Sequence, residues 1–90
     1  MADITVTSIG PREFEVQVRD GDLETNHHVT VPESLIDELQ LPEDDLEEVV
    51  RESFIFLLAR EPASSIMSEF SLDVISGYFP EYKEELSQRF

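Results

Sequence analysis

Residues 13–31, EFEVQVRDGDLETNHHVTV, alternate apolar and polar side chains on both sides of a turn sequence. A period of two places successive side chains on opposite faces, which is typical of strands with one buried face. Asp20-Gly21, between the two runs, is a strong signal for a two-residue hairpin turn, and Pro32 ends the second run. The stretch therefore predicts an antiparallel hairpin with one apolar face.

A third strand is expected before this hairpin. The run ITVTS, residues 4–8, alternates in the same way, and Gly10-Pro11 separates it from the hairpin. We therefore expect a three-stranded antiparallel meander over about residues 3–31. The first strand carries no lysine and no internal proline, so its edge lacks the usual protection against pairing with another strand. Pairing of two such edges is one hypothesis for a homodimer.

From Glu33 onward the apolar residues follow helical spacing. A short helix is expected over 33–39, and a longer one begins at Asp45, which forms a capping-box-like start with Glu48. The longer helix carries one apolar stripe, at positions 46, 49, 50, 53, 54, 57 and 58. Pro62 ends it.

The last third of the chain predicts shorter helices, over about 64–70 and 72–78, and a polar helix after Pro80. A sheet with one apolar face needs a cover, and the long helix is suited to that role. We expect one domain of 90 residues and of the α+β class, with three or four helices packed on one face of the meander.

Charge is the strongest signal in the composition. Twenty-one acidic residues face six basic ones, for a net charge of −15. Nucleic-acid binding depends on basic residues that neutralise phosphates, so we expect neither direct nucleic-acid binding nor binding to anionic membranes. The acidity is a solubilising surface, an adaptation to a salty cytosol or a face for a basic protein partner, including mimicry of nucleic acid. The chain has no cysteine, and we expect a cytoplasmic location.

The two histidines do not form a metal site in the expected fold. Neighbouring residues of a strand point to opposite faces, so His27 and His28 cannot bind one ion together. A turn at 20–21 places His28 across from Glu13, on the surface, and His27 across from Phe14, at the margin of the core. Because zinc sites need three or four convergent ligands, we expect no metal and no other cofactor.

The sequence carries no signature of catalysis. Its three glycines leave little room for a phosphate-binding loop, and no serine has a histidine near it in the sequence. The carboxylates lie in polar stretches, whereas catalytic carboxylates need burial or a specific charged neighbour. We therefore expect no enzymatic activity. An enzymatic or small-molecule-binding domain is the alternative, since site residues can converge from distant segments.

Residues 27–39, HHVTVPESLIDEL, are similar to the strand-then-helix opening of ribbon-helix-helix DNA-binding proteins. Those proteins read the major groove with polar or basic residues on a paired strand. Here the outward positions hold His28, Thr30 and acids, and two further strands are expected before this one. A DNA-linked or antitoxin-like regulator is therefore a further alternative.

The long helix carries candidate interface residues outside its core stripe. Ile55 lies opposite the centre of the stripe, next to Arg51, and Phe56 lies at its margin. One exposed apolar residue is ordinary on a protein surface. The other interpretation is a second packing surface, covered by the C-terminal helices or by another protein. This helix is thus a second candidate contact for a homodimer.

Residues 53–82, SFIFLLAREPASSIMSEFSLDVISGYFPEY, resemble a family of small prokaryotic proteins without an assigned function. The pattern is carried here by Ser53-Phe54, Phe56-Leu57-Leu58, Arg60-Glu61-Pro62, Ser65-Ile66, Phe70, Leu72, Ile75 and Tyr78 to Tyr82. The chain departs from it at Ala59 and Gly77, where the family is expected to carry charged side chains. The resemblance covers about a third of the chain and implies architecture without an activity.

Two features of this segment add candidate residues. Arg60 and Glu61 are expected to act as a structural charged pair at a helix end, with presentation to a ligand as the alternative. The hydroxyls of Tyr78 and Tyr82 need water or a partner, which predicts a position at a rim, beside Glu81. The sequence as a whole favours a non-catalytic module that acts through an unidentified protein partner, with a basic protein as one candidate, or through self-association.

Overall fold

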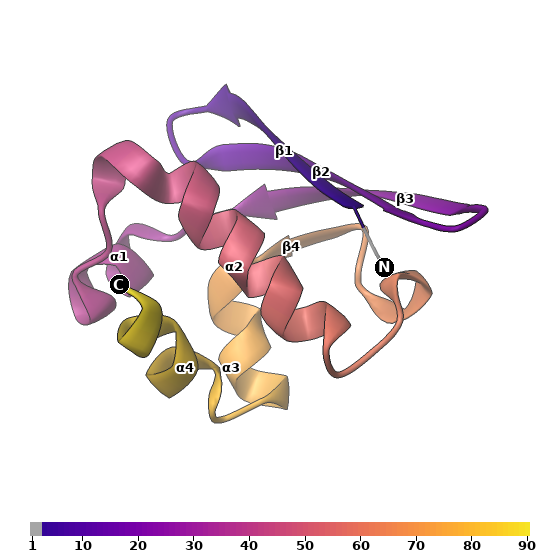
Figure 1. The fold of residues 1–90 in the computed structure, drawn as a ribbon. Helices are drawn as coiled ribbons and strands as arrows, with labels where there is room; N and C mark the ends of the chain where they lie inside the picture. Colours follow the sequence, from indigo (N-terminus) through magenta and orange to yellow (C-terminus); the bar gives the residue numbers. More distant parts are fainter. Residues whose placement is uncertain (1–2) are drawn as a thin grey trace.

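The computed structural model describes residues 3–90, and Figure 1 shows their arrangement. Three strands of eight residues come first: β1 (Asp3–Gly10), β2 (Glu13–Asp20) and β3 (Leu23–Thr30). The later elements are α1 (Glu33–Leu39), α2 (Leu46–Leu58), β4 (Glu69–Ser71), α3 (Ile75–Tyr78) and α4 (Tyr82–Arg89). Short 3-10 turns lie at Glu43–Asp45, Ala63–Ser65 and Leu72–Val74.

The α+β class is confirmed, but the sheet has four strands, in the order β1-β2-β3-β4. The first three form the expected antiparallel meander. The fourth, β4, pairs in parallel with β3 through Val29 and Phe70 and their neighbours. The prediction of three strands was wrong because β4 has only three residues, too few to show a period of two. The same segment had been assigned to a helix over 64–70.

The hairpin between β2 and β3 has a register two residues from the expected one. Asp20 pairs with Leu23, so the two loop residues are Gly21 and Asp22. Gly21 has a φ of 64°, and glycine with positive φ at the first loop position is typical of a type II′ turn. His28 therefore lies across from Glu15 rather than Glu13. A shift of two residues leaves every side chain on its expected face.

All the helices lie on one face of the sheet, and α2 crosses beneath the strands in Figure 1. The core is formed by the inward residues of the strands, such as Val16 and Val29, and the apolar stripe of α2, such as Val50 and Phe54. The opposite face of the sheet is uncovered and polar, with Glu15 among its residues. The core layer therefore lies between sheet and helices, as the alternating pattern predicts.

The start of α2 differs from the expectation. The helix begins at Leu46 after a 3-10 turn, and Asp45 makes no side-chain hydrogen bond as its cap. The capping box predicted from Asp45 and Glu48 is therefore not formed. Acidic residues still occupy the first turn, where they interact favourably with the positive end of the helix dipole.

His27 is part of the core rather than at its margin. Its Nδ1 lies 2.7 Å from the carbonyl oxygen of Met67, and its Nε2 lies 2.9 Å from the hydroxyl of Thr25. A carbonyl only accepts, so Nδ1 carries a proton, and in the neutral ring the Thr25 hydroxyl donates to Nε2. The ring centroid lies 5.3 Å from that of Phe54. His27 thereby attaches the segment before β4 to β3.

Candidate functional site

Two of the predicted interface residues lie together at the free edge of the sheet. Arg51, on α2, donates from Nη1 to the carbonyl oxygen of Ile4 on β1 at 2.8 Å, and its Nε lies 3.7 Å from a carboxylate oxygen of Glu48. Ile55, one turn later on α2, is 42% exposed. A shallow hollow is lined by both residues and by Asp3, Ile4, Thr5, Gln17 and Arg19. The edge strand and the long helix, treated as separate contacts above, thus form one surface.

Phe56 does not belong to this surface. It is buried, with ring centroids of Phe79 and Tyr82 at 5.9 and 5.3 Å. Its prediction as an interface residue was wrong, because α4 and Phe79 pack against α2 on this side, so the alternative of a cover by the C-terminal segment applies to Phe56. The helical stripe is therefore wider than the sequence pattern alone indicated.

Tyr82 is likewise buried, so its predicted position at a rim was wrong. Its hydroxyl lies 2.7 Å from the hydroxyl of Ser53, which itself donates to the carbonyl of Val49 at 2.8 Å. Tyr82 is therefore the donor to Ser53. Burial raises the pKa of Tyr82 above its ordinary range, because the charged phenolate would lose its hydration. The hydrogen-bond partner of the Tyr82 hydroxyl is therefore Ser53, inside the protein.

Arg60 and Glu61 do not pair with each other. Arg60 folds back over the Phe56 ring, with Cζ at 3.6 Å from the ring centroid, and donates from Nη1 to the Phe56 carbonyl at 3.1 Å. This is a capping role at the C-terminal end of α2. Glu61 turns the other way, into a groove. The structural role at a helix end that was predicted for both residues therefore applies to Arg60 alone.

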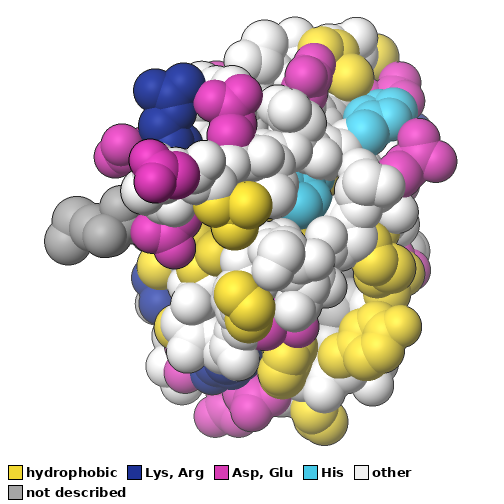
Figure 2. All heavy atoms as spheres, turned by 90° about the vertical axis from the view of Figure 1, so that its right-hand side faces the viewer, with side chains coloured by type: hydrophobic (Ala, Val, Ile, Leu, Met, Phe, Trp, Pro, Cys, Tyr) yellow, Lys and Arg dark blue, Asp and Glu magenta, His cyan; other side chains and the backbone are white. Residues whose placement is uncertain are grey.

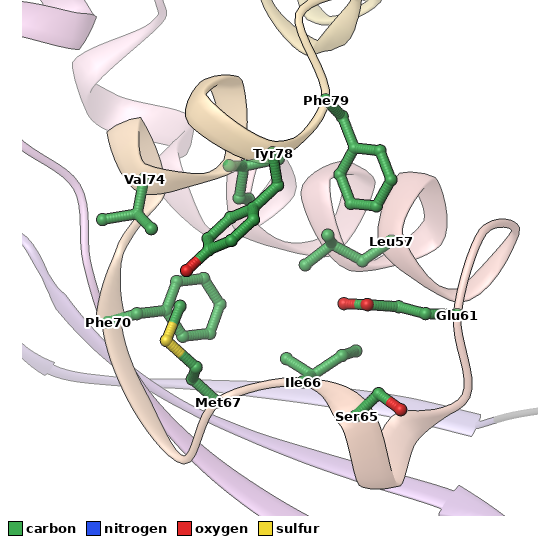
Figure 3. Close-up of a pocket in the computed structure, with 10 residues that line it drawn as sticks. Leu57, Glu61, Ser65, Ile66, Met67, Phe70, Val74, Tyr78 and Phe79 are labelled. Atoms are coloured by element: carbon green, nitrogen blue, oxygen red, sulfur yellow. The ribbon is translucent and has the colours of Figure 1, made fainter.

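The groove lies between the end of α2, the segment before β4, and α3, and has a volume of about 230 Å³. Figure 3 shows Glu61 pointing into it from one side, with Met67 and Tyr78 on the other. Its lining residues are Leu57, Glu61, Ser65, Ile66, Met67, Phe70, Val74, Ile75, Tyr78 and Phe79. Figure 2 shows the same side of the molecule, where apolar side chains gather in the lower half.

Tyr78 is the predicted rim residue that the structure places at the groove. It is 68% exposed, and its ring stands beside the apolar lining. Glu81, expected beside it, is exposed just before α4 and does not line the groove. The role of Glu61 was missed because its orientation depends on the turn after α2, which no local pattern encodes.

Glu61 has no cationic partner within residues 3–90. The chain contains six Lys and Arg residues, and each contacts another group: Arg12 with Glu33, Arg19 with Glu24, Arg51 with Glu48, Arg60 with Phe56, Lys83 with Glu38, and Arg89 with Glu52. The half-buried Glu61 carboxylate therefore faces an apolar groove without a compensating charge. A site of this kind favours a ligand that is both apolar and cationic.

The outer face of the sheet carries the second histidine. His28 Nε2 lies 3.3 Å from Glu13 and its Nδ1 lies 3.2 Å from Glu69, so it connects β2 with β4. In the part of the chain that the structure describes, no group of three or more His, Asp or Glu residues is placed to hold a metal ion. In residues 3–90, no helix is long and apolar enough to cross a membrane.

Comparison with protein-family models, with curated proteins and with solved structures finds no match for this chain. The resemblance drawn from residues 53–82 therefore stays a prediction, and functional inference depends on the two surfaces described above.

Proposed function

We propose that the protein is a non-catalytic protein–protein interaction module that self-associates through the surface formed by β1 and α2. The observation that supports this proposal is the unpaired edge of β1, with exposed Ile55 beside it. Every second residue of an edge strand presents its backbone N–H and C=O away from the sheet. These groups bind another strand readily.

The charge distribution favours this edge over the other surfaces. Two copies that each carry a net charge of −15 repel each other, so they can approach only where the local charge is low. Residues 4–11, ITVTSIGP, contain no Asp, Glu, Lys or Arg. Most of β1 is therefore free of the repulsion that opposes contact elsewhere.

The edge of the sheet opposite β1 is less suited to pairing. There β4 covers the last residues of β3, His28–Thr30, and β4 itself has only three residues. Short edge strands are one of the devices by which proteins limit edge pairing. The proposed dimer therefore joins β1 to β1 about a two-fold axis, which places α2 of both copies on the same face of one continuous sheet.

Arg51 limits this contact without preventing it. Its bond to the Ile4 carbonyl occupies one lone pair, and a carbonyl oxygen has two. The remaining outward groups of β1 are open to a second copy. Ile55 of one copy then packs near Ile55 of the other, because α2 lies next to β1 and close to the axis.

Sedimentation equilibrium of the wild type and of Ile55→Glu tests this proposal. We expect a concentration-dependent dimer for the wild type and a monomer for the variant. Their melting temperatures should agree at concentrations where the wild type is monomeric, because dimerisation itself raises the melting temperature. Leu23→Glu is the matched control, because Leu23 is 43% exposed, lies on β3, two strands away from β1, and does not line the hollow beside Ile55. A wild type that is monomeric at millimolar concentration would contradict the proposal.

Salt distinguishes self-association from binding to a basic partner. Added salt screens the repulsion between two acidic copies, so dimerisation should strengthen between about 50 and 500 mM salt. A complex with a basic protein should weaken over the same range.

We also propose a cytoplasmic location, because a chain without cysteine makes no use of an oxidising compartment.

A further inference from the structure

We infer that the groove beside Glu61 is a second binding site, which takes an arginine or lysine side chain presented by a partner protein. The groove shares no lining residue with the β1–α2 surface. This inference therefore goes beyond self-association and can fail independently of it.

The size of the groove indicates a single side chain. Sites for drug-sized molecules usually have volumes of roughly 300–1,000 Å³. The volume here is about 230 Å³, below that range. An arginine or lysine side chain is long and narrow, with an apolar stem and a charged head, and commonly packs its stem along apolar surface.

The lining matches the two parts of such a side chain. Met67, Ile66 and Phe70 offer apolar contact for the stem, and Glu61 offers a carboxylate for the head. The ring of Tyr78 stands at the rim, where a guanidinium can also lie against its face. The planar guanidinium of arginine suits both the carboxylate and the ring, so arginine is expected to bind more tightly than lysine.

Within residues 3–90, no basic side chain is available to pair with Glu61. All six basic side chains contact other groups, and Arg60, the nearest in sequence, points away toward Phe56. The net charge of −15 adds long-range attraction for a basic partner. That attraction also explains why the partner is expected to be a protein with a basic surface rather than another copy of this chain.

A peptide titration followed by ¹⁵N NMR tests the inference. The probe is acetyl-Gly-Arg-Gly-amide, and the matched probe replaces arginine by citrulline, which has the same shape without the charge. We expect shift changes at Met67, Phe70 and Tyr78, and affinity at least fivefold higher for the arginine peptide. Equal affinities for the two peptides would overturn the inference, because the carboxylate would then make no contribution.

Two variants separate a specific site from general attraction to an acidic protein. Glu61→Gln should remove the preference for arginine over citrulline. Glu81→Gln removes the same charge outside the groove and should leave that preference within twofold of the wild type. An equal loss in both variants would show non-specific attraction only and would overturn the site. A thermal melt of each variant shows that the fold is retained.

Two further probes test whether the apolar stem of the side chain contributes to binding and whether the ligand is a protein or a small molecule. Triglycine amide carries a cationic N-terminus without an aliphatic side-chain stem, and should not shift the groove residues. If it binds as tightly as the arginine peptide, the apolar lining plays no part and the inference fails. Free L-arginine should bind no tighter than the blocked peptide. Tighter binding would assign the groove to a small molecule instead of a partner protein.

Discussion

The first three strands and the last third of the chain are held in place by different means. In β1, β2 and β3, nearly all residues are paired through an antiparallel ladder over short loops, with one shift of register between Ser8 and Gly10. Residues 59–90 contain only short elements, of which the longest is α4 with eight residues. Elements of this length are marginal by themselves and depend on tertiary contacts.

Besides the short pairing of β4 with β3 and the buried apolar residues, two specific side-chain hydrogen bonds hold the last third in place. His27 bonds to the backbone of Met67 and holds the segment before β4, and Tyr82 bonds to Ser53 and holds α4 against α2. Both proposed surfaces follow from this difference. The regular ladder leaves a free edge at β1, whereas the irregular segment leaves a groove between elements that do not fill the space completely.

The largest effect is expected from Phe54→Ala, because Phe54 lies where the two regions meet. Its ring is fully buried and contacts the rings of His27 and Phe70, with centroids at 5.3 and 6.0 Å. Removing a buried phenylalanine ring typically lowers the free energy of unfolding by about 3–5 kcal/mol. Urea denaturation should show this loss in a single transition.

The control for this variant is Ile55→Ala, next to it on the exposed side of α2. That change should alter the free energy of unfolding of the monomer by no more than about 0.5 kcal/mol, as is usual for surface positions. Two separate transitions in Phe54→Ala would show that the regions unfold independently, and would contradict a shared core.

The contrast between the regions also explains which parts of the fold the sequence predicts. The short helix over 33–39 and the inward faces of β2 and β3 agree with the structure, because local periodicity determines them. The groove, by contrast, depends on β4, which pairs with a strand about forty residues earlier. Tyr82 follows the same rule, since its hydroxyl bonds to Ser53 on α2, distant in sequence, whereas the orientation of Glu61 depends on the turn that follows α2.

The second prediction breaks the attachment of the irregular segment. His27→Leu keeps most of the side-chain volume but removes the bond to the Met67 carbonyl. The bond is part-buried, and an acceptor that loses its partner away from water costs about 1–3 kcal/mol. We expect a loss of that size, and hydrogen exchange should increase most strongly at residues 66–71 and little in the β1–β2 ladder.

His28→Leu is the matched substitution on the outer face of the same strand. His28 is partly exposed and contacts carboxylates at the surface, so its removal should cost no more than about 1 kcal/mol. If both histidine variants increase exchange equally across the sheet, His27 has no special role in holding the segment before β4.

The third prediction concerns the attachment of α4. Tyr82→Phe removes the hydroxyl that donates to Ser53, while Ser53 keeps its bond to the Val49 carbonyl. Loss of one hydrogen bond without an unsatisfied partner should lower the free energy of unfolding by about 0.5–1.5 kcal/mol. Chemical denaturation at neutral pH measures this difference.

The pH dependence of the same variant identifies the buried hydroxyl. The pKa of Tyr82 is raised in the folded state, so the folded protein retains this proton at a pH where the unfolded chain releases it. The stability from Tyr82 is therefore fully present below about pH 10, the ordinary pKa of tyrosine, and is lost as the pH rises above it. Tyr82→Phe should lack this component of the alkaline loss. Identical slopes in both proteins above that pH would contradict the burial of Tyr82.

The smallest effect is expected at the surface of the last third. Lys83 on α4 forms an ion pair with Glu38 on α1 at 3.0 Å, and both side chains are partly exposed. Such pairs contribute about 0.2–1 kcal/mol at low salt and less when salt screens them. Lys83→Met should therefore lower the free energy of unfolding by less than Tyr82→Phe, and the difference from the wild type should disappear near 1 M salt. A larger loss that persists at high salt would mean that charge pairs, rather than the buried Tyr82–Ser53 contact, hold α4 in place.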